Sequence, residues 1–461
     1  MRRLAFFLAL LAAAPAARAQ VPADTSRTSV PEPVPEPVPE PADTSQVPAP
    51  VPEPAGPDPE ANEPDAGDPG SINDGTAVDD GRVAVRPRLA PSALYSSNLG
   101  VGFGAGVAVD NVGWRGSEIG VDVRVQRRAL GAGATLSTSD PYASRVFGIV
   151  SASAATTSRR QFFGVGPFTS GNRALALSHD EVDAEARVGV YPFGTAALLV
   201  QPGVRFLLDR SGAVRGDSPV GLGDLSAASQ AAVRPVIGEV RTGISVGVEV
   251  TTDFRDWPAY PRSGVVVSAE ARRFAGLDAE ALRFTRTAVQ STAYTPLYGR
   301  TVLLASVIGV VTRQGDADGD GAPDAIPYYY LPTLDERAAV AYRQDRLTGR
   351  DLFALGLGVR APLYDFLGVY GIDAVVVGYL GNVYDDLFRQ FSPGVTFGQD
   401  ATADADGRAR LRPALGLGLG IVNLDKERVV LGALVGVGAG GVTVASLQIA
   451  YNLRDSRPLF R

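Results

Sequence analysis

The chain contains no cysteine and only one histidine in 461 residues. The lack of cysteine excludes disulfide bonds and thiolate metal sites. The formal net charge of −7 argues against a nucleic-acid partner, because binding to phosphates requires a basic face. After the first residues, no stretch reaches the ~18 consecutive apolar residues of a membrane helix. The chain is therefore either a soluble protein or a membrane protein built from strands, and composition alone does not separate the two.

The first residues have the organisation of an export signal. Arg2 and Arg3 precede an unbroken apolar run at residues 4–14, which is too short to cross a bilayer as a helix. The small-x-small pattern at residues 17–19 predicts cleavage at that point. We therefore expect a signal peptide at residues 1–19 and a mature chain that starts at Gln20. Because no cysteine follows the cleavage site, a lipoprotein anchor is excluded.

Residues 20–83 form a low-complexity segment rich in proline and glutamate. Repeated Pro-Glu-Pro-Val units at residues 30–40 and 47–54 leave almost no aromatic side chains with which to build a core. Proline at this density favours the extended polyproline II conformation. The segment is predicted to be a disordered periplasmic stalk that acts as a spacer, and docking to a partner or to the cell wall is the alternative.

From residue 84 to residue 461 the sequence alternates with a period of two, which is typical of strands. At residues 415–421, bulky apolar residues alternate with glycine. At residues 181–190, valine and alanine alternate mostly with charged residues. One apolar face and one small or charged face suit a strand that separates lipid from a polar lumen.

The breaks between these segments predict sixteen strands, at residues 86–94, 98–110, 115–126, 129–138, 145–157, 181–191, 195–208, 236–251, 264–275, 280–294, 300–312, 351–361, 367–381, 407–422, 428–437 and 441–453. The connections alternate in length, and one set holds every long loop: 158–180, 209–235, 313–350 and 382–406. Short periplasmic turns opposite long external loops are typical of bacterial barrels. The predicted fold is all-β, a sixteen-strand antiparallel transmembrane β-barrel at residues 84–461. The even number of strands places the C-terminus on the periplasmic side, together with the stalk.

Aromatic residues gather beside the predicted short turns. They are Trp114, Tyr191, Phe193, Trp257, Tyr260, Tyr294, Tyr298, Tyr364 and Phe366. Aromatic girdles at the two membrane interfaces would place them there. Each one alone would be an ordinary turn or core residue, and it is the shared position that supports a barrel.

One predicted external loop carries four aspartates in the spacing of a calcium loop, with glycine at the sharp-turn position: Asp316, Asp318, Asp320 and Asp324. Pro327 stands where an EF-hand would have its bidentate glutamate, so the loop is not an EF-hand. The spacing is closer to the short Asp-rich repeats of extracellular calcium-binding modules. Calcium binding and a merely solvated acidic loop both remain open.

Catalysis has little support in the sequence. His179, the single histidine, lies between Ser178 and Asp180 at the end of a predicted external loop. Neighbours in sequence point in opposite directions on a strand, so their adjacency does not make a catalytic triad. We therefore predict a solvated loop histidine and no enzyme.

The segment 253–264 resembles the periplasmic turn of the BamA/TamA-type surface-antigen barrels, an outer-membrane assembly superfamily. The matching residues are Asp253, Arg255, Asp256, Pro258, Pro261 and Gly264. The two prolines restrict the turn, and Gly264 permits backbone angles that other residues avoid. The strand count independently puts this segment on the periplasmic side.

Three further stretches resemble the same family. Residues 160–167 look like its aromatic-Gly-Ile-Gly element, and residues 368–386, with Asp373, are similar to its Asp-x-Gly-Asn-aromatic strand. A third stretch resembles the part of the long sixth loop that re-enters the next strand. Its matching residues are Tyr342, Arg343, Asp345 and Arg346. The order and spacing of these elements carry the resemblance, which covers most of residues 84–453.

The resemblance implies an integral outer-membrane protein that assists insertion or translocation of protein or lipid clients without chemistry. It implies no required cofactor, a barrel held in outer-membrane lipid, and partners among unfolded outer-membrane proteins or periplasmic subunits. In that family the mechanism relies on a weak seam between the first and last strands, which opens and templates client strands.

Two departures favour a rival class, a passive channel or a barrel that displays loops on the surface. The N-terminal modules that receive clients in the family are absent, so this chain resembles a short member with a stalk in their place. The family's sixth loop also carries an arginine that pairs with acidic wall residues, whereas residues 340–342 read Val-Ala-Tyr here. Arg337 and Arg343 are the candidates to replace that arginine.

Overall fold

The computed structural model describes residues 86–96, 100–112, 117–138, 145–169, 174–193, 198–257, 260–278, 282–315, 325–334, 342, 345–397, 403–424, 428–438 and 441–449. All of them belong to the second of two units, Asn73–Arg461. The predicted signal peptide and stalk lie outside the described residues. None of the described helices is long and apolar enough to cross a membrane.

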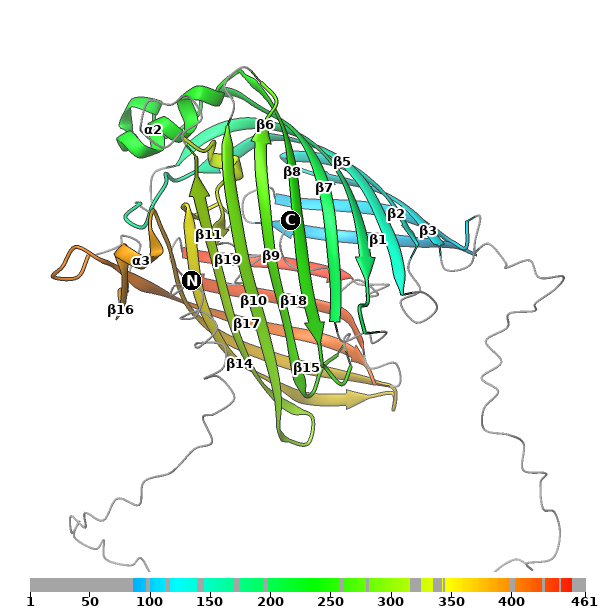
Figure 1. The fold of residues 1–461 in the computed structure, drawn as a ribbon. Helices are drawn as coiled ribbons and strands as arrows, with labels where there is room; N and C mark the ends of the chain where they lie inside the picture. Colours follow the sequence, from blue (N-terminus) through cyan, green and yellow to red (C-terminus); the bar gives the residue numbers. More distant parts are fainter. Residues whose placement is uncertain are drawn as a thin grey trace, which may run out of the picture. The chain divides into compact units, whose positions relative to one another are not determined.

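Sixteen strands follow one another as an antiparallel meander and form a curved wall (Figure 1). They are β1 (Arg86–Ser96), β2 (Gly100–Asp110), β3 (Ser117–Gln126), β4 (Ala129–Thr138), β5 (Val146–Phe162), β6 (Leu175–Val190), β7 (Leu198–Val214), β8 (Val240–Asp253), β9 (Gly264–Gly276), β10 (Arg283–Tyr298), β11 (Thr301–Gln314), β14 (Asp351–Phe366), β15 (Tyr370–Tyr384), β17 (Ala409–Asn423), β18 (Arg428–Gly438) and β19 (Gly441–Ile449). Every predicted strand has its counterpart. The predicted fold class, a sixteen-strand antiparallel barrel, is confirmed.

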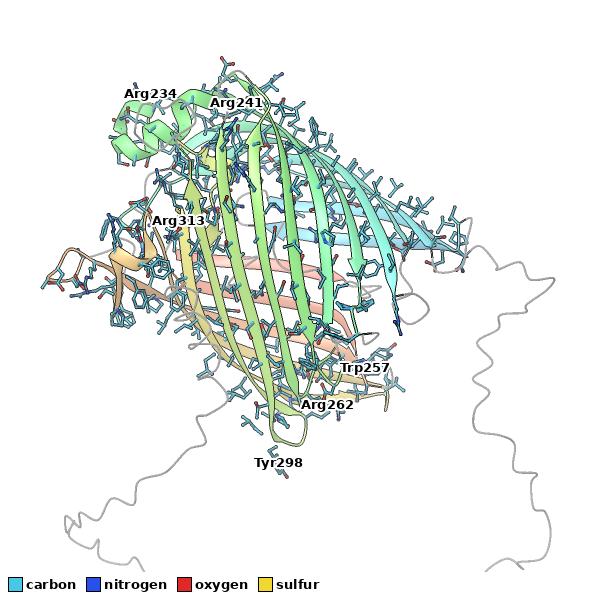
Figure 2. All side chains as sticks on the ribbon, in the orientation of Figure 1. Arg234, Arg241, Trp257, Arg262, Tyr298 and Arg313 are labelled. Atoms are coloured by element: carbon cyan, nitrogen blue, oxygen red, sulfur yellow. The ribbon has the colours of Figure 1, made fainter. Side chains whose placement is uncertain are left out.

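The connections sort by length between the two ends of the strands, as predicted. At one end, here called the short-turn end, the longest connection is the turn at residues 254–263. The opposite, long-loop end carries the extended connections 163–174, 215–239, 315–350 and 385–408. These hold the short elements η2 (Leu222–Asp224), α2 (Ala227–Val233), η3 (Arg234–Val236), η4 (Tyr328–Tyr330), β12 (Thr333–Leu334), β13 (Leu347–Thr348), α3 (Leu387–Gln390) and β16 (Phe391–Val395). Figure 2 marks Trp257, Arg262 and Tyr298 at the short-turn end.

The predicted bounds were wrong at the long-loop end of β5, β6 and β7. These strands extend well into the ranges 158–180 and 209–235 that the sequence predicted as loops. The alternation weakens there because both faces of the strands are covered by the connections that fold over them. Phe162, Leu175 and Leu177, for example, pack in one buried cluster with Val233 of α2 and Tyr328 of η4.

The two faces of the wall differ as the alternation predicts. On β17, Leu417 is 52% exposed and points away from the lumen with its neighbours Leu415 and Leu419, while glycines occupy the inner positions between them. On β6, Val182 and Val188 are exposed on the outer face, and the charged residues face inward. An outer belt of exposed aliphatic side chains fits hydrocarbon better than water.

The first and last strands form a seam. Each consecutive pair of wall strands is joined by an antiparallel ladder, from β1–β2 through β18–β19. β1 and β19 lie close to each other, but within the described residues no hydrogen-bonded register joins them. Both are short compared with β5 and β7.

Candidate functional site

The short-turn motif is built by local hydrogen bonds in the turn between β8 and β9. Asp253 accepts from the backbone N–H of Arg255 at 3.1 Å and from its Nε at 2.8 Å. Oδ1 of Asp256 accepts from the backbone N–H groups of Trp257, Arg262 and Ser263 at 2.8–3.1 Å. Burial raises the pKa of Asp256, but these donors outweigh it and hold the pKa below its usual value. The two carboxylates therefore fix the shape of the turn.

Glycine is required at the end of this turn. Gly264 has φ 103°, and a Cβ there would lie 2.1 Å from the carbonyl oxygen of Phe254. Pro258, the first of the two motif prolines, lies outside the described residues. The second, Pro261, accepts a hydrogen bond at its carbonyl oxygen from Arg360 Nη2 at 2.5 Å.

The turn reaches from β8–β9 to the inner faces of β14 and β15. Tyr260 was expected in the aromatic girdle, but it is only 1% exposed, and its hydroxyl donates to the carboxylate of Asp373 on β15. The Arg360 guanidinium lies over its ring, 3.7 Å from the centroid. Burial and the hydrogen bond to Asp373 raise the pKa of Tyr260 to about 12. Two motifs from separate parts of the sequence thus meet at the short-turn end.

The other motifs meet near the long-loop end. Tyr342 lies in the connection 315–350, called the sixth loop here after the family it resembles. It is buried and donates its hydroxyl hydrogen to the backbone oxygen of Arg412 on β17. It belongs to an apolar cluster in which β12 and β13 of the sixth loop pack on the inner faces of β10, β11, β14, β15 and β17. The members are Ala288, Ile308, Val310, Leu334, Tyr342, Leu347, Leu352, Ala354, Val383 and Ala414. The sixth loop therefore folds back into the lumen.

Two arginines hold the first long connection in place, one from the sixth loop and one from β17. Arg346 is buried and donates to the side-chain and backbone oxygens of Thr169 at 2.8 and 2.9 Å. Arg412 donates to the backbone oxygen of Pro167 at 2.6 Å. Asp345 forms an ion pair with Arg160 at 3.2 Å, and the N–H of Gly166 donates to Thr348 at 2.8 Å.

The substitute for the family's loop arginine was sought at Arg337 or Arg343, and both lie outside the described residues. The described part of the loop is held by apolar packing around Tyr342 and by hydrogen bonds from Arg346 to backbone and hydroxyl oxygens. Arg412, an anchor of this contact, was not singled out from the sequence. Its inward position follows from the alternation along β17, whereas its contact with Pro167 is a signal that only the assembled sheet supplies.

The inner wall between the Tyr260 contact at the short-turn end and the Tyr342 contact at the long-loop end is charged. Arg272 on β9 donates to Glu185 of β6 at 2.8 Å and to its neighbour Glu270 at 2.6 Å. Arg187 joins Glu185 at 2.9 Å and Glu249 of β8 at 3.1 Å. The alternation at residues 181–190 predicted this face, but not the partners on the other strands.

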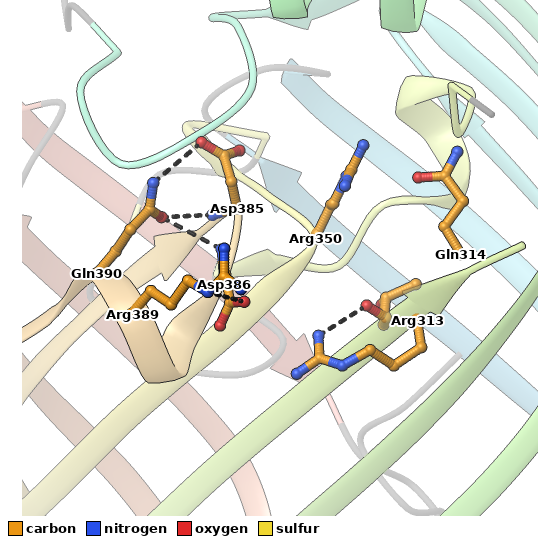
Figure 3. A pocket seen from close by; sticks show the side chains of 8 residues that line it. Arg313, Gln314, Arg350, Asp385, Asp386, Arg389 and Gln390 are labelled. Carbon is orange, nitrogen blue, oxygen red and sulfur yellow. Dashed lines mark hydrogen bonds and ion pairs between the residues drawn. The ribbon is translucent and has the colours of Figure 1, made fainter. Parts of the chain in front are cut away.

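A shallow pocket opens at the long-loop end between β11, β14 and α3 (Figure 3). Arg313 pairs with Asp351 at 3.2 Å, and Arg389 pairs with Asp386 at 3.6 Å. The side chain of Arg350 extends into the same space. The arginine and aspartate charges that line the pocket largely compensate one another. The pocket therefore does not indicate a particular ligand.

Of two predictions about loops, the structure tests only one. The predicted calcium loop, with Asp316, Asp318, Asp320 and Asp324, lies outside the described residues. The prediction of a solvated loop histidine was wrong: His179 lies within β6 and is 4% exposed. The strand begins earlier than its alternation indicates, so the histidine faces the lumen beneath the sixth loop.

Comparisons with known proteins give a likeness in structure only. No family model matches the chain, and no curated protein matches it in sequence. The crystal structure of BamA from Haemophilus ducreyi lacking POTRA domains 1–3 superposes with a TM-score of 0.52 at 12% identity, over 80% of this chain and 70% of that one. CdiB from Escherichia coli gives 0.49 at 12% identity, over 78% and 62%. The likeness to BamA confirms, at the level of the fold, the resemblance that the motifs predicted.

Proposed function

We propose that the chain is an integral outer-membrane barrel that assists the insertion or translocation of protein or lipid clients without catalysing a reaction. The observation that carries the proposal is the seam. Within the described residues, β1 and β19 lie close together without a ladder, whereas each consecutive pair of wall strands from β1–β2 to β18–β19 is paired. Strand edges with unpaired N–H and C=O groups are templates for another strand. A client strand would add to β1 or β19 and leave into the membrane.

The height of the wall supports the same proposal. A strand needs about 9–11 residues to cross the hydrocarbon core when tilted. β19 has 9 residues and β1 has 11, whereas β5 and β7 have 17 each. The described strands at and next to the seam, β1 to β4 with β18 and β19, have 9–11 residues each and so just match the hydrocarbon core where a client would have to enter it. A locally thin bilayer lowers the cost of inserting a polar backbone.

The rival function is a passive channel or a barrel that only displays loops. Tyr342 and its cluster fold into the lumen near one end, and the turn with Tyr260 crosses toward Asp373 at the other. Both features reduce the cross-section that a wide diffusion channel would need. The proposed partners are outer-membrane lipid, unfolded outer-membrane proteins, and a periplasmic subunit that supplies the client-receiving modules.

Locking the seam tests the proposal. The chain has no cysteine of its own, so introduced pairs report cleanly. One series joins Leu89→Cys on β1 with Val442→Cys or Val444→Cys on β19. The matched control joins Ala105→Cys and Val123→Cys, which are register partners on β2 and β3. Each is oxidised in liposomes and assayed for insertion of a urea-unfolded eight-stranded barrel.

Oxidation of the seam pair is expected to abolish insertion, and reduction to restore it, while the control pair stays active in both states. If the locked seam inserts the client as well as the open one, the seam has no such role. If no form inserts clients but all conduct ions equally, the barrel is a channel.

A further inference from the structure

A second group of polar side chains lies apart from the family motifs, on the inner wall at the long-loop end of β6 and β7. His179 and Glu181 are two residues apart on β6 and therefore share a face. Asp209 on β7 is the register partner of Glu181. Three potential metal ligands, one nitrogen and two carboxylate oxygens, are thus fixed by the sheet itself.

The three side chains converge without bonding to one another. Nε2 of His179 lies 3.6 Å from Oδ1 of Asp209 and 4.0 Å from Oε2 of Glu181, and all three ligand atoms lie within 4.8 Å of one another. These separations are too long for hydrogen bonds. Asp209 is 3% exposed; Tyr330 of η4 donates one hydrogen bond to its carboxylate, but Oδ2 has no hydrogen-bond partner among the described residues. A buried carboxylate in that state is costly unless a cation is supplied.

The nearby cations are already engaged. Arg160 is paired with Asp345 at 3.2 Å. Arg205 donates to both oxygens of Asp183, at 2.9 and 2.5 Å, and reaches Glu181 only at 4.0 Å. Two carboxylates and one imidazole therefore share a site whose charge the surrounding arginines do not fully balance.

Aromatic rings of the sixth loop close the site on the lumen side. The ring centroids of Tyr328 and Tyr329 in η4 lie 6.3 and 5.1 Å from that of His179. The two rings also contact each other in a T-shaped arrangement at 5.3 Å. The group is thus shielded from bulk water, while Glu181, whose side chain is 40% exposed, keeps one side accessible.

We propose that His179, Glu181 and Asp209 bind a divalent transition-metal ion of the zinc type. One imidazole and two carboxylates form a ligand set that such ions accept, with water at the remaining position. Metal–ligand bonds of about 2.0–2.2 Å place neighbouring ligand atoms roughly 3.3–3.7 Å apart. The His179–Asp209 separation already fits this range, and the exposed Glu181 side chain closes the rest by a small rotation. The bound ion would join the β6–β7 wall beneath the tyrosines and hold that part of the sixth loop in place.

The test uses the full-length protein in detergent, stripped with chelator and kept free of calcium. Zinc binding is measured by titration calorimetry, and cobalt is added separately as a spectroscopic probe of the ligand set. Asp209→Asn and His179→Gln remove one ligand each with little change in volume. Asp180→Asn is the matched control, because it changes the same strand on the opposite face. A fourth variant, Asp318→Ala plus Asp320→Ala, separates this site from the predicted calcium loop.

Wild type, Asp180→Asn and the loop double variant are expected to bind one equivalent of zinc and to unfold at a higher temperature with it. They should also give the same visible cobalt spectrum. Asp209→Asn and His179→Gln should weaken binding by at least about 10-fold, since even partners of metal ligands cost that much. If wild type shows no saturable binding, or if Asp209→Asn and Asp180→Asn bind alike, the cluster is not a metal site. If only the loop double variant loses zinc, the ion binds at the loop instead.

Discussion

Two parts of the barrel wall place charged residues on the inner face by the same alternation, but they bury the resulting ion pairs to different extents. The tall wall, strands β5 to β17, has an inner ion pair between Arg272 and Glu185 at 2.8 Å, with side chains 8% and 11% exposed. The low wall, β1 to β4 with β18 and β19, has an inner pair between Arg124 and Asp122 at 2.9 Å, 58% and 42% exposed. The two ion pairs have nearly equal distances, but the first is buried and the second is exposed to solvent.

The difference comes from the neighbours. Next to Arg124 and Asp122 the inner positions of β2 and β4 are glycines, such as Gly104 and Gly133, so water reaches both charges. Arg272 also faces a glycine on β8, Gly247, but acceptors from three strands surround its guanidinium: Glu185 at 2.8 Å, Glu270 at 2.6 Å and Ser245 at 3.2 Å. An exposed pair contributes little to stability, whereas breaking a buried one leaves unpaired charges. The low wall, which includes the seam, is therefore the easier part to open.

The largest difference in stability is expected when one arginine is removed from the ion pair of the tall wall and one from the ion pair of the low wall. Arg272→Ala leaves Glu185 and Glu270 without a shared partner, and the free energy of unfolding should fall by about 3–5 kcal/mol. Arg124→Ala should change it by less than about 1 kcal/mol. Urea unfolding in detergent, followed by the shift in gel mobility, measures both. Equal losses for the two variants would show that the tall and low walls do not differ in the way that their burial indicates.

An intermediate effect is expected at the turn that joins β8–β9 to the tall wall. Tyr260→Phe removes a hydrogen bond to a buried carboxylate and should cost about 1.5–3 kcal/mol, while Tyr298→Phe, at an exposed position, should cost almost nothing. The folded pKa of Tyr260, about 12, lies above the ordinary value of 10.0. This contact therefore stabilises the fold fully below pH 10 and is lost as the pH rises through about 12.

Thermal unfolding between pH 9 and pH 12 measures this loss. The difference in stability between wild type and Tyr260→Phe should shrink as the pH rises. A difference that stays constant over that range would mean that the hydroxyl of Tyr260 does not stabilise the turn through Asp373.

A smaller effect is expected at the longest connection of the tall wall. We propose that calcium binds the loop aspartates Asp316, Asp318, Asp320 and Asp324. Carboxylates this close repel one another unless a cation binds, and hard oxygen ligands suit calcium with a Kd of about 10⁻⁴–10⁻³ M. Protease cleavage of this loop should slow in millimolar calcium, and Asp318→Ala plus Asp320→Ala should remove the difference. A wild-type cleavage rate that calcium leaves unchanged would identify a merely solvated acidic loop.

The smallest effect is expected from the segment that precedes the low wall. We propose that residues 20–83 are a spacer that contributes nothing to the folding of the barrel, because they have almost no apolar surface to bury. Deletion of this segment should leave the folding yield and the unfolding temperature unchanged for both walls. A clear loss of thermal stability would show that the segment packs against the barrel.

The sequence by itself determined the strand wall and the orientation of its faces. Alternation at residues 415–421 and 181–190 placed leucines and valines outside and glycines and charges inside, because successive side chains of a strand point in opposite directions. It also predicted which end has the long connections. The short-turn motif was predictable because the bonds of Asp253 and Asp256 are local, within a few residues along the chain.

Only the tertiary structure decided which of these residues meet. Tyr260 and Asp373 are separated by 113 positions, and Arg346 and Thr169 by 177, so neither contact leaves a pattern within a sequence window. His179 was assigned to a loop because the alternation fades where the connections cover both faces of β6, and the register with β7 is what brings Asp209 beside it. The seam between β1 and β19 is likewise a property of the whole wall, because the curvature of all the strands together brings the first and the last strand close to each other. Local propensity fixes the faces of a strand, but the partners across a lumen are fixed only when the sheet curves and brings distant strands together.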